Sequence, residues 1–324
     1  MPQFLDLPRE IRDMIYIAII TAERPRPILG EAHWLFRFRK VFESSASSYG
    51  EYGCAYALEQ KPTTCANFLR CSRQIYAEMS EAIRIARRKG RVSVKLDCVA
   101  EDESFHYFTW LAIPFVKTSV SVDEPKSRII PGWADRMMEK YLTCPHRMLS
   151  SGCLSCPSST TLIEKLWVDI RLIGDRSAKW IRNNNRPDRT SWAVCAAVKR
   201  LLLHGPDFQS IKDSRNTIEV DELILNVVTP SNVPNENYLA EDFPTDMTSD
   251  GLVHPRTVAK ELVDVWNKIW GAADFRGGFY YILIERIKRV RVCINEETWR
   301  VRELRLELER GQAERRRIAA RAGW

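Results

Sequence analysis

The feature that most constrains this chain is a repeated change in hydrophobic period between residues 91 and 295. Apolar and polar residues alternate, as in strands with one buried face, in RVSVKLDCV (91–99), TSVSVD (118–123), LIEKLWVDIRLI (162–173), VDELILNVV (220–228) and IKRVRVCIN (287–295). Helical stretches at Ser191–Leu203 and Arg256–Trp270 separate the last three segments. Strands that alternate with helices form crossover units. This order therefore predicts an α/β fold with a mixed, partly parallel sheet and flanking helices, with α+β as the alternative class.

Two helices are expected before this domain. The first covers residues 6–20, where Asp6 can cap the helix, Pro8 fits its first turn, and apolar residues follow at helical spacing: Ile11, Met14, Ile15, Ala18 and Ile19. The second covers residues 64–89 and stops at Gly90, with an apolar stripe formed by Phe68, Cys71, Ile75, Met79, Ala82, Ile83 and Ala86. The two stripes predict that the helices pack on each other.

A long loop at about 30–62 is expected between these helices, because Gly30–Pro62 lacks a clear period and contains SSASSYGEYG. At the other end of the chain, arginine and glutamate recur at i, i+4 spacing, which predicts a charged helix over residues 296–319. The expected organisation is a helical element at 1–90, an α/β domain at 91–295 and a charged C-terminal segment at 296–324.

The composition favours an intracellular protein, in the cytoplasm or the nucleus. Charged residues make up 28% and hydrophobic residues 45% of the 324 residues, which predicts a packed core rather than disorder or membrane insertion. No apolar run approaches the roughly 20 residues that cross a bilayer, and the N-terminal segment lacks the pattern of a signal peptide. The nine cysteines are odd in number and several lie in apolar runs, which favours a reducing compartment.

Two segments carry a more specific pattern. They are LPREIRDMIY at residues 7–16 and FLRCSRQIYAE at residues 68–78. Together they resemble F-box-like proteins of filamentous fungi, whose N-terminal region has the form LPxEIRxxIY followed by a helix of the form L-x-x-C-R-Q-I-x-x-E. Most members of that group have no established activity.

The resemblance implies a protein-docking role for the helical element. In an F-box, the surface around the proline and its apolar neighbours binds a Skp-type adaptor of a cullin ubiquitin ligase. By this resemblance the adaptor-facing or core positions are Leu7, Pro8, Ile11 and Ile15, braced by Leu69, Cys71 and Ile75, with Arg9, Glu10 and Arg12 as a charged rim. The alternative is that both helices only pack on the α/β domain.

A second group of residues lies in CPHRMLSSGCLSC. Cys144, His146, Cys153 and Cys156 are residue types that bind zinc, and Cys153 and Cys156 have the C-x2-C spacing of a zinc turn. The first pair has the tighter C-x-H spacing. Bound zinc and unliganded thiols therefore both stay open as interpretations of this segment.

Catalytic motifs are absent from the sequence. It contains no G-x-S-x-G elbow, P-loop, G-x-G-x-x-G or H-E-x-x-H motif, and its five histidines are scattered. We therefore expect an interaction protein rather than an enzyme, with substrate recognition for a ubiquitin ligase as the role that the resemblance implies. The alternative is a basic nucleic-acid-associated protein that uses the C-terminal arginines, above all Arg315–Arg317; the net charge of the chain is +7.

Overall fold

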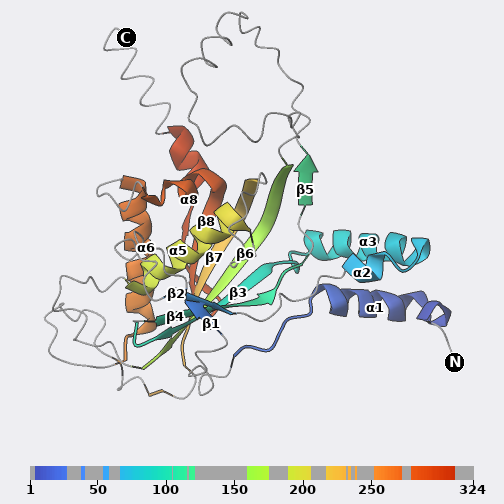
Figure 1. The fold of residues 1–324 in the computed structure, drawn as a ribbon, viewed down its shortest axis with the longest axis horizontal. Coiled ribbons are helices and arrows are strands. Elements are labelled where there is room, and N and C mark those ends of the chain that lie inside the picture. The colour runs from blue at the N-terminus through green and yellow to red at the C-terminus, as the bar shows by residue number, and fades with distance from the viewer. Residues whose placement is uncertain are drawn as a thin grey trace, which may run out of the picture.

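The computed structural model describes residues 4–27, 38–40, 54–57, 66–103, 105–114, 117–120, 159–174, 189–205, 217–230, 233–234, 238, 252–271 and 279–310. Within them, nine strands form one mixed sheet (Figure 1) with the order β1-β2-β4-β3-β6-β7-β8-β9, and β5 pairs with β6 outside this path. The strands are β1 (Phe38–Lys40), β2 (Cys54–Ala57), β3 (Val94–Glu101), β4 (Phe105–Ala112), β5 (Lys117–Val120), β6 (Ser159–Ile173), β7 (Thr217–Val228), β8 (Ile287–Ile294) and β9 (Glu297–Arg302).

The centre of the sheet is parallel, as the alternation of strands and helices predicts. Strands β3, β6, β7 and β8 run parallel to one another, and β2 runs parallel to β4. Helices α5 (Arg189–His204), α6 (Pro255–Gly271) and α8 (Tyr281–Arg286) lie between the last three of these strands in the chain. The α/β class and the two crossover helices are therefore confirmed.

The face of the sheet toward α5 and α6 carries the main apolar core. From Leu166 in β6 and from Leu223 in β7 onward, alternate residues are buried there, as a period of two requires. The members from β6 are Ile163, Leu166, Val168, Ile170 and Leu172, and those from β7 are Val220, Leu223, Leu225 and Val227. Trp192 on α5 and Trp266 on α6 belong to the same cluster.

The N-terminal helices form a smaller unit. Helix α1 (Arg9–Ile20) follows a short 3-10 turn at Phe4–Asp6, and α2 (Ala66–Leu69) precedes α3 (Arg73–Arg88). In Figure 1 these helices lie apart from α5, α6 and α8. They share a separate apolar cluster made of Tyr16, Ile20, Ile75, Met79, Ala82, Ala86 and Val92. Among the described residues, no helix combines the length and apolar character needed to cross a membrane.

The second predicted helix is interrupted and ends where expected. The chain leaves the helical path at 70–72, and the Ser72 hydroxyl then accepts a hydrogen bond from the Ile75 amide (3.1 Å), which starts α3. At the other end Gly90 adopts φ +65°, and its amide and the Arg91 amide bond back to the carbonyls of Arg87 and Ala86. This bond pair is the Schellman motif, so the prediction of Gly90 as the stop is confirmed.

Three strands correct the sequence interpretation of residues 30–62 and 105–112. Strands β1 and β2 fall inside the expected loop, and the side chains of β2 from Cys54 to Tyr56 are buried in the sheet. Strand β4 was missed because FHYFTWLA has no alternation; a strand covered on both faces has a continuous apolar run instead.

The predicted helix at 296–319 is wrong over residues 296–303. Asn295 and Glu296 both have positive φ, and they turn the chain so that β9 pairs antiparallel with β8. A two-residue turn with positive φ at both positions favours a hairpin. A helix then covers residues 304–310, and the remainder of the prediction lies outside the described residues.

Candidate functional site

The two halves of the sequence pattern meet in a buried ion pair between α1 and α3. The Arg12 guanidinium donates from Nε to Oε2 of Glu78 (2.9 Å) and from Nη2 to Oε1 (2.8 Å). The Tyr16 hydroxyl donates to the same Oε2 (2.8 Å). Arg12, Tyr16 and Glu78 are all buried. A bidentate arginine–carboxylate pair fixes both distance and orientation, so it holds the two helices in one rotational setting.

Further contacts complete this network, which we call the Glu78 clamp: Arg12, Tyr16, Gln74 and Glu78. Gln74 Nε2 donates to Glu78 Oε1 (3.0 Å). Arg12 Nη1 donates to the backbone carbonyls of Leu5 (3.1 Å) and Leu7 (2.5 Å), which ties the 3-10 turn to α1. The clamp therefore joins three parts of the helical element: the turn, α1 and α3.

The charges of the clamp are fixed near neutral pH. The hydrogen bond from Arg12 is the largest cause that lowers the pKa of Glu78, to about 2; burial opposes it, while Gln74 and Tyr16 act in the same direction as Arg12. Burial, and then the bond to Glu78, raise the pKa of Tyr16 to about 12. Neither group exchanges a proton between pH 5 and 9, so the clamp is suited to holding structure rather than to acid–base catalysis.

The face of α1 that points away from the clamp is apolar and exposed. Ile11 is 43% exposed and Met14 is 68% exposed. Ala18, one turn further along, is exposed as well. On α3, Tyr76 is 59% exposed. We call Ile11 and Met14 the outer face of α1.

This arrangement corrects the expected packing of the first helix. The helices do pack on each other, but the buried positions of α1 are Arg12, Tyr16 and Ile20 rather than the stripe that begins at Ile11 and Met14. Arg12 was expected at a charged rim and is buried instead. The period of 3.6 identifies two apolar faces in this helix, and the ion pair with Glu78 decides which of them faces inward.

The candidate partner-binding residues of α1 divide between surface and interior. Pro8, Glu10 and Ile11 are exposed, while Leu7 and Ile15 are half-buried. The first three are therefore accessible to a partner, and the other two contribute partly to packing.

The candidate residues near α3 divide in the same way. Ile75 is buried in the apolar cluster of the helical element, and Leu69 is half-buried against that cluster. Cys71 is exposed in the break between α2 and α3. Ile75 and Leu69 thus pack in the apolar cluster of the helical element, whereas Cys71 is at the surface.

The other candidates belong to two further segments of the sequence. Cys144, His146, Cys153 and Cys156 lie outside the described residues, as does Arg315–Arg317. In the part of the chain that the structure describes, no group of three or more histidine, cysteine or acidic side chains is arranged to hold a metal. Upstream of 311, Arg302 and Arg305 pair with Glu307 and Glu309.

The other face of the sheet carries a row of buried polar residues that was not predicted from the sequence. Asp97, Asp169 and Asn226 occupy matching positions on β3, β6 and β7, and all three are buried. Asn226 Nδ2 donates to Asp169 Oδ1 (2.7 Å). Arg171 donates to both oxygens of Asp97 (2.8 and 2.6 Å). The available signal was a polar residue in the middle of each apolar segment: KLDCV, WVDIR and ILNVV.

The polar row connects the sheet to the chain that follows α1. Arg26 Nη2 donates to Asp169 Oδ2 (2.5 Å), and Arg171 Nη2 donates to the Pro27 carbonyl (3.0 Å). Burial is the largest influence on Asp97 and raises its pKa, while Arg171 opposes that shift. Because protein groups fill these hydrogen-bonding positions, the row anchors the N-terminal element to the sheet.

Comparison with known proteins identifies no matching family. None of the protein-family models, curated proteins or solved structures compared with this chain gives a match. The functional reading therefore rests on the geometry of the clamp, the outer face of α1 and the sequence pattern that contains both.

Proposed function

We propose that the N-terminal helical element is a protein-docking surface and that the chain is an intracellular interaction protein of the F-box-like type, without catalysis of its own. The observation that carries this proposal is the opposite orientation of neighbouring residues in LPREIRDMIY. Arg12 and Tyr16 point inward to Glu78, whereas Ile11 and Met14 are exposed.

The exposed side chains suit an interface. Large apolar groups with charged neighbours are typical of the central part and rim of a protein-binding surface, and here Pro8, Arg9 and Glu10 flank Ile11. The clamp adds preorganisation, because a surface already held in one conformation loses less entropy when a partner binds.

The partner that the sequence resemblance implies is a Skp-type adaptor. In that arrangement α1 contacts the adaptor of a cullin ubiquitin ligase, and the α/β domain carries the surface that recognises a substrate. The two roles are assigned to separate parts of the chain, since the helical element and the sheet have separate apolar clusters.

The test is a calorimetric titration of the full chain with a purified fungal Skp-type adaptor. Replacing Ile11 and Met14 together with Asp should abolish binding and leave the melting temperature nearly unchanged, since surface changes alter stability little. Leu306→Asp is the matched control, because Leu306 is also an exposed apolar residue (50%) but lies on the helix at 304–310.

Two results would contradict the proposal. The first is a parent chain that binds no adaptor, in titration or in affinity purification from the native cell. The second is a double variant that binds as tightly as the parent. Loss of binding in both the double variant and Leu306→Asp would show a general effect of added charge rather than a docking surface.

A further inference from the structure

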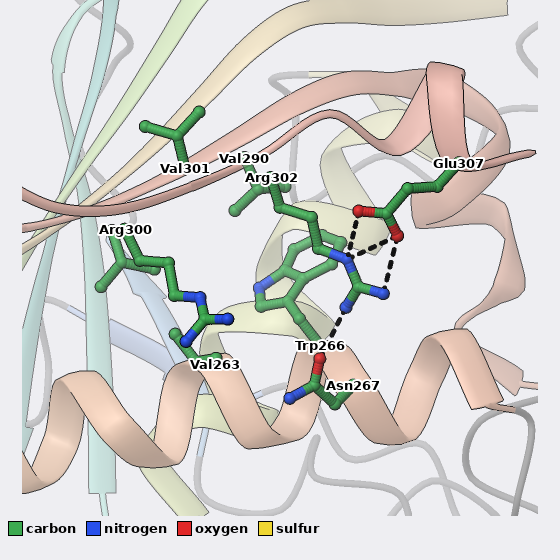
Figure 2. A pocket seen from close by; sticks show the side chains of 9 residues that line it. Val263, Trp266, Asn267, Val290, Arg300, Val301, Arg302 and Glu307 are labelled. Atoms are coloured by element: carbon green, nitrogen blue, oxygen red, sulfur yellow. Dashed lines mark hydrogen bonds and ion pairs between the residues drawn. The ribbon is translucent and has the colours of Figure 1, made fainter.

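A pocket at the other end of the sheet is independent of the proposed docking surface. It lies between α6, the β8–β9 hairpin and the helix at 304–310 (Figure 2), and it has a volume of about 230 Å³. Its lining residues are Val263, Trp266, Asn267, Val290, Val292, Arg300, Val301, Arg302 and Glu307. The walls are thus about half apolar and half polar, and the polar part comes from Asn267, Glu307 and the two arginines.

The register of the hairpin places both arginines on the side of α6. Val290 pairs with Arg302 and Val292 pairs with Arg300, and directly paired residues project from the same face of a sheet. Val290 and Val292 belong to the main apolar core, which also contains Trp266 of α6. Arg300 and Arg302 therefore project toward the covering helix, and Arg300 is itself exposed. Trp299 and Val301, on either side of Arg300 in the chain, are exposed as well.

Arg302 already has protein partners. It donates to Glu307 from Nε (2.9 Å) and pairs with the same carboxylate through Nη2 (2.8 Å). Its Nη1 donates to Asn267 Oδ1 (2.8 Å), and its guanidinium carbon lies 5.3 Å from the centre of the Trp270 ring. Arg302 is therefore a structural part of the pocket wall.

Arg300 and Trp266 differ from Arg302. No hydrogen bond or ion pair joins Arg300 to any of the described residues. Trp266 is only 3% exposed, and its indole Nε1 has no hydrogen-bond partner in the described part of the chain. Figure 2 shows this nitrogen on the side of the ring that faces Arg300. A buried donor without an acceptor is costly, so the Trp266 indole nitrogen points to an acceptor that the described residues do not supply. The Arg300 side chain is exposed, so its guanidinium is open to an acceptor from outside the described residues.

We propose that this pocket binds a small carboxylate that carries an aromatic or branched apolar group. Its carboxylate pairs with Arg300 and accepts a hydrogen bond from Trp266 Nε1, and its apolar group packs against Val263, Val290 and Val292. Arginine and carboxylate are complementary in charge and geometry. A cavity of about 150 Å³ holds benzene, so the present volume suits about ten non-hydrogen atoms.

Phenylacetate has this size and chemistry, and it serves as the probe. Isothermal titration of the full chain should detect binding that weakens with added salt. Arg300→Gln should weaken it about tenfold or more, the loss expected for a charge-assisted hydrogen bond. Arg305→Gln is the matched control, because Arg305 lies near the same hairpin but pairs with Glu309 (3.1 Å) and does not line the pocket; its affinity should equal that of the parent.

The second probe is phenylacetamide, which has the same shape without the charge and should bind about tenfold more weakly or worse. The Trp266 indole N–H resonance, assigned with Trp266→Phe, should shift when phenylacetate is added to the parent chain. This readout does not depend on the stability of the Trp266 variant.

The same chemistry occurs in free acids and at the carboxyl terminus of a peptide. Titration with Gly-Gly-Phe and with its C-terminal amide separates the two sources. If phenylacetate binds and the tripeptide does not, the ligands of the pocket are free acids. If the tripeptide acid binds more tightly than its amide, the ligands are the carboxyl termini of peptides. The proposal is overturned if neither acid produces heat or an indole shift at millimolar concentration, or if Arg300→Gln binds phenylacetate as the parent does.

Discussion

The N-terminal helical element and the central sheet are held together by different interactions. Between the sheet and its helices α5 and α6, the buried side chains form a large and almost wholly apolar cluster. The helical element has a much smaller apolar cluster, and the Glu78 clamp lies beside it. Apolar burial stabilises strongly but has no direction, whereas a bidentate ion pair has a defined geometry.

This difference explains how one helix can offer an apolar face to solvent. A pair of short helices with apolar residues on more than one side could associate in several rotational settings. The pairing of Arg12 with Glu78 selects the setting in which Ile11 and Met14 are exposed. Buried ion pairs often contribute more to specificity of structure than to stability, and we assign that role to the clamp.

The largest effect is expected in the sheet. Leu223 on β7 is fully buried in the main cluster, so Leu223→Ala removes apolar contacts and leaves a cavity. It should lower the free energy of unfolding by about 4 kcal/mol. Urea denaturation followed by circular dichroism measures this loss. A change below about 1 kcal/mol would show that the sheet does not depend on its apolar core as described.

The next effect is expected in the clamp. Glu78→Ala leaves the Arg12 guanidinium without its buried partner and should destabilise the helical element by about 3 kcal/mol. Limited proteolysis should then cut α1 faster, while the sheet stays resistant. Glu81→Ala is the control, because Glu81 forms an ion pair with Arg84 at the surface of α3 and its loss should change stability little. Equal losses of stability in the two variants would show that the clamp contributes no more than a surface ion pair.

Acid should affect the two regions over different pH ranges. Burial lowers the pKa of His106 on β4 from 6.5 to about 3, so the unfolded chain takes up a proton that the folded sheet excludes. The contribution of His106 to the free energy of unfolding therefore falls as the pH drops from 6.5 toward 3. The pKa of Glu78 is lowered from 4.5 to about 2, so its contribution is complete above pH 4.5 and is lost as pH falls through 2.

Variants separate these ranges. Unfolding measured against pH should lose part of its slope between pH 6.5 and 4.5 in His106→Gln, and part of its slope between pH 4.5 and 2 in Glu78→Gln. If Glu78→Gln alters the slope only between pH 6.5 and 4.5, the Glu78 carboxylate is not held by Arg12 as the structure shows.

The smallest effect is expected at the outer face of α1. Ile11→Asp alone should change the free energy of unfolding by less than about 0.5 kcal/mol, since its side chain is 43% exposed. Thermal unfolding measures this difference. Ile75→Asp is the contrasting variant: Ile75 is buried on α3, and a buried unpaired carboxylate should cost about 3 kcal/mol or more. Similar losses for both variants would place Ile11 in the core.

The hydrophobic period within each segment predicted the parallel strands at the centre of the sheet. Strands β6, β7 and β8 and helices α5 and α6 lie where alternation and helical spacing place them, because each element buries one regular face or stripe. Strand β9 was missed because Glu296, Arg300 and Glu303 are four and three residues apart, spacings that also suit a helix. The turn at Asn295 and Glu296 decided the outcome, and its conformation depends on contacts with the end of β7.

The contacts that define the candidate sites join distant residues, so local patterns could not reveal them. Arg12 and Glu78 are 66 residues apart, and Arg171 and Asp97 are 74 apart. The resemblance includes Arg12, Tyr16 and Glu78 as motif positions, but it placed Arg12 at a charged rim rather than in the interior. No sequence pattern pointed to Trp266 and Arg300 as a pair, because their proximity depends on how α6 covers the β8–β9 hairpin.

Hydrogen exchange followed by mass spectrometry tests the central claim most directly: that the Glu78 clamp holds the helical element while the apolar core holds the sheet. In Glu78→Ala, amides of α1 and α3 should exchange about a hundredfold faster than in the parent, the factor that about 3 kcal/mol represents, with β6 and β7 unchanged. Faster exchange throughout the chain, or unchanged exchange in α1, would contradict the account.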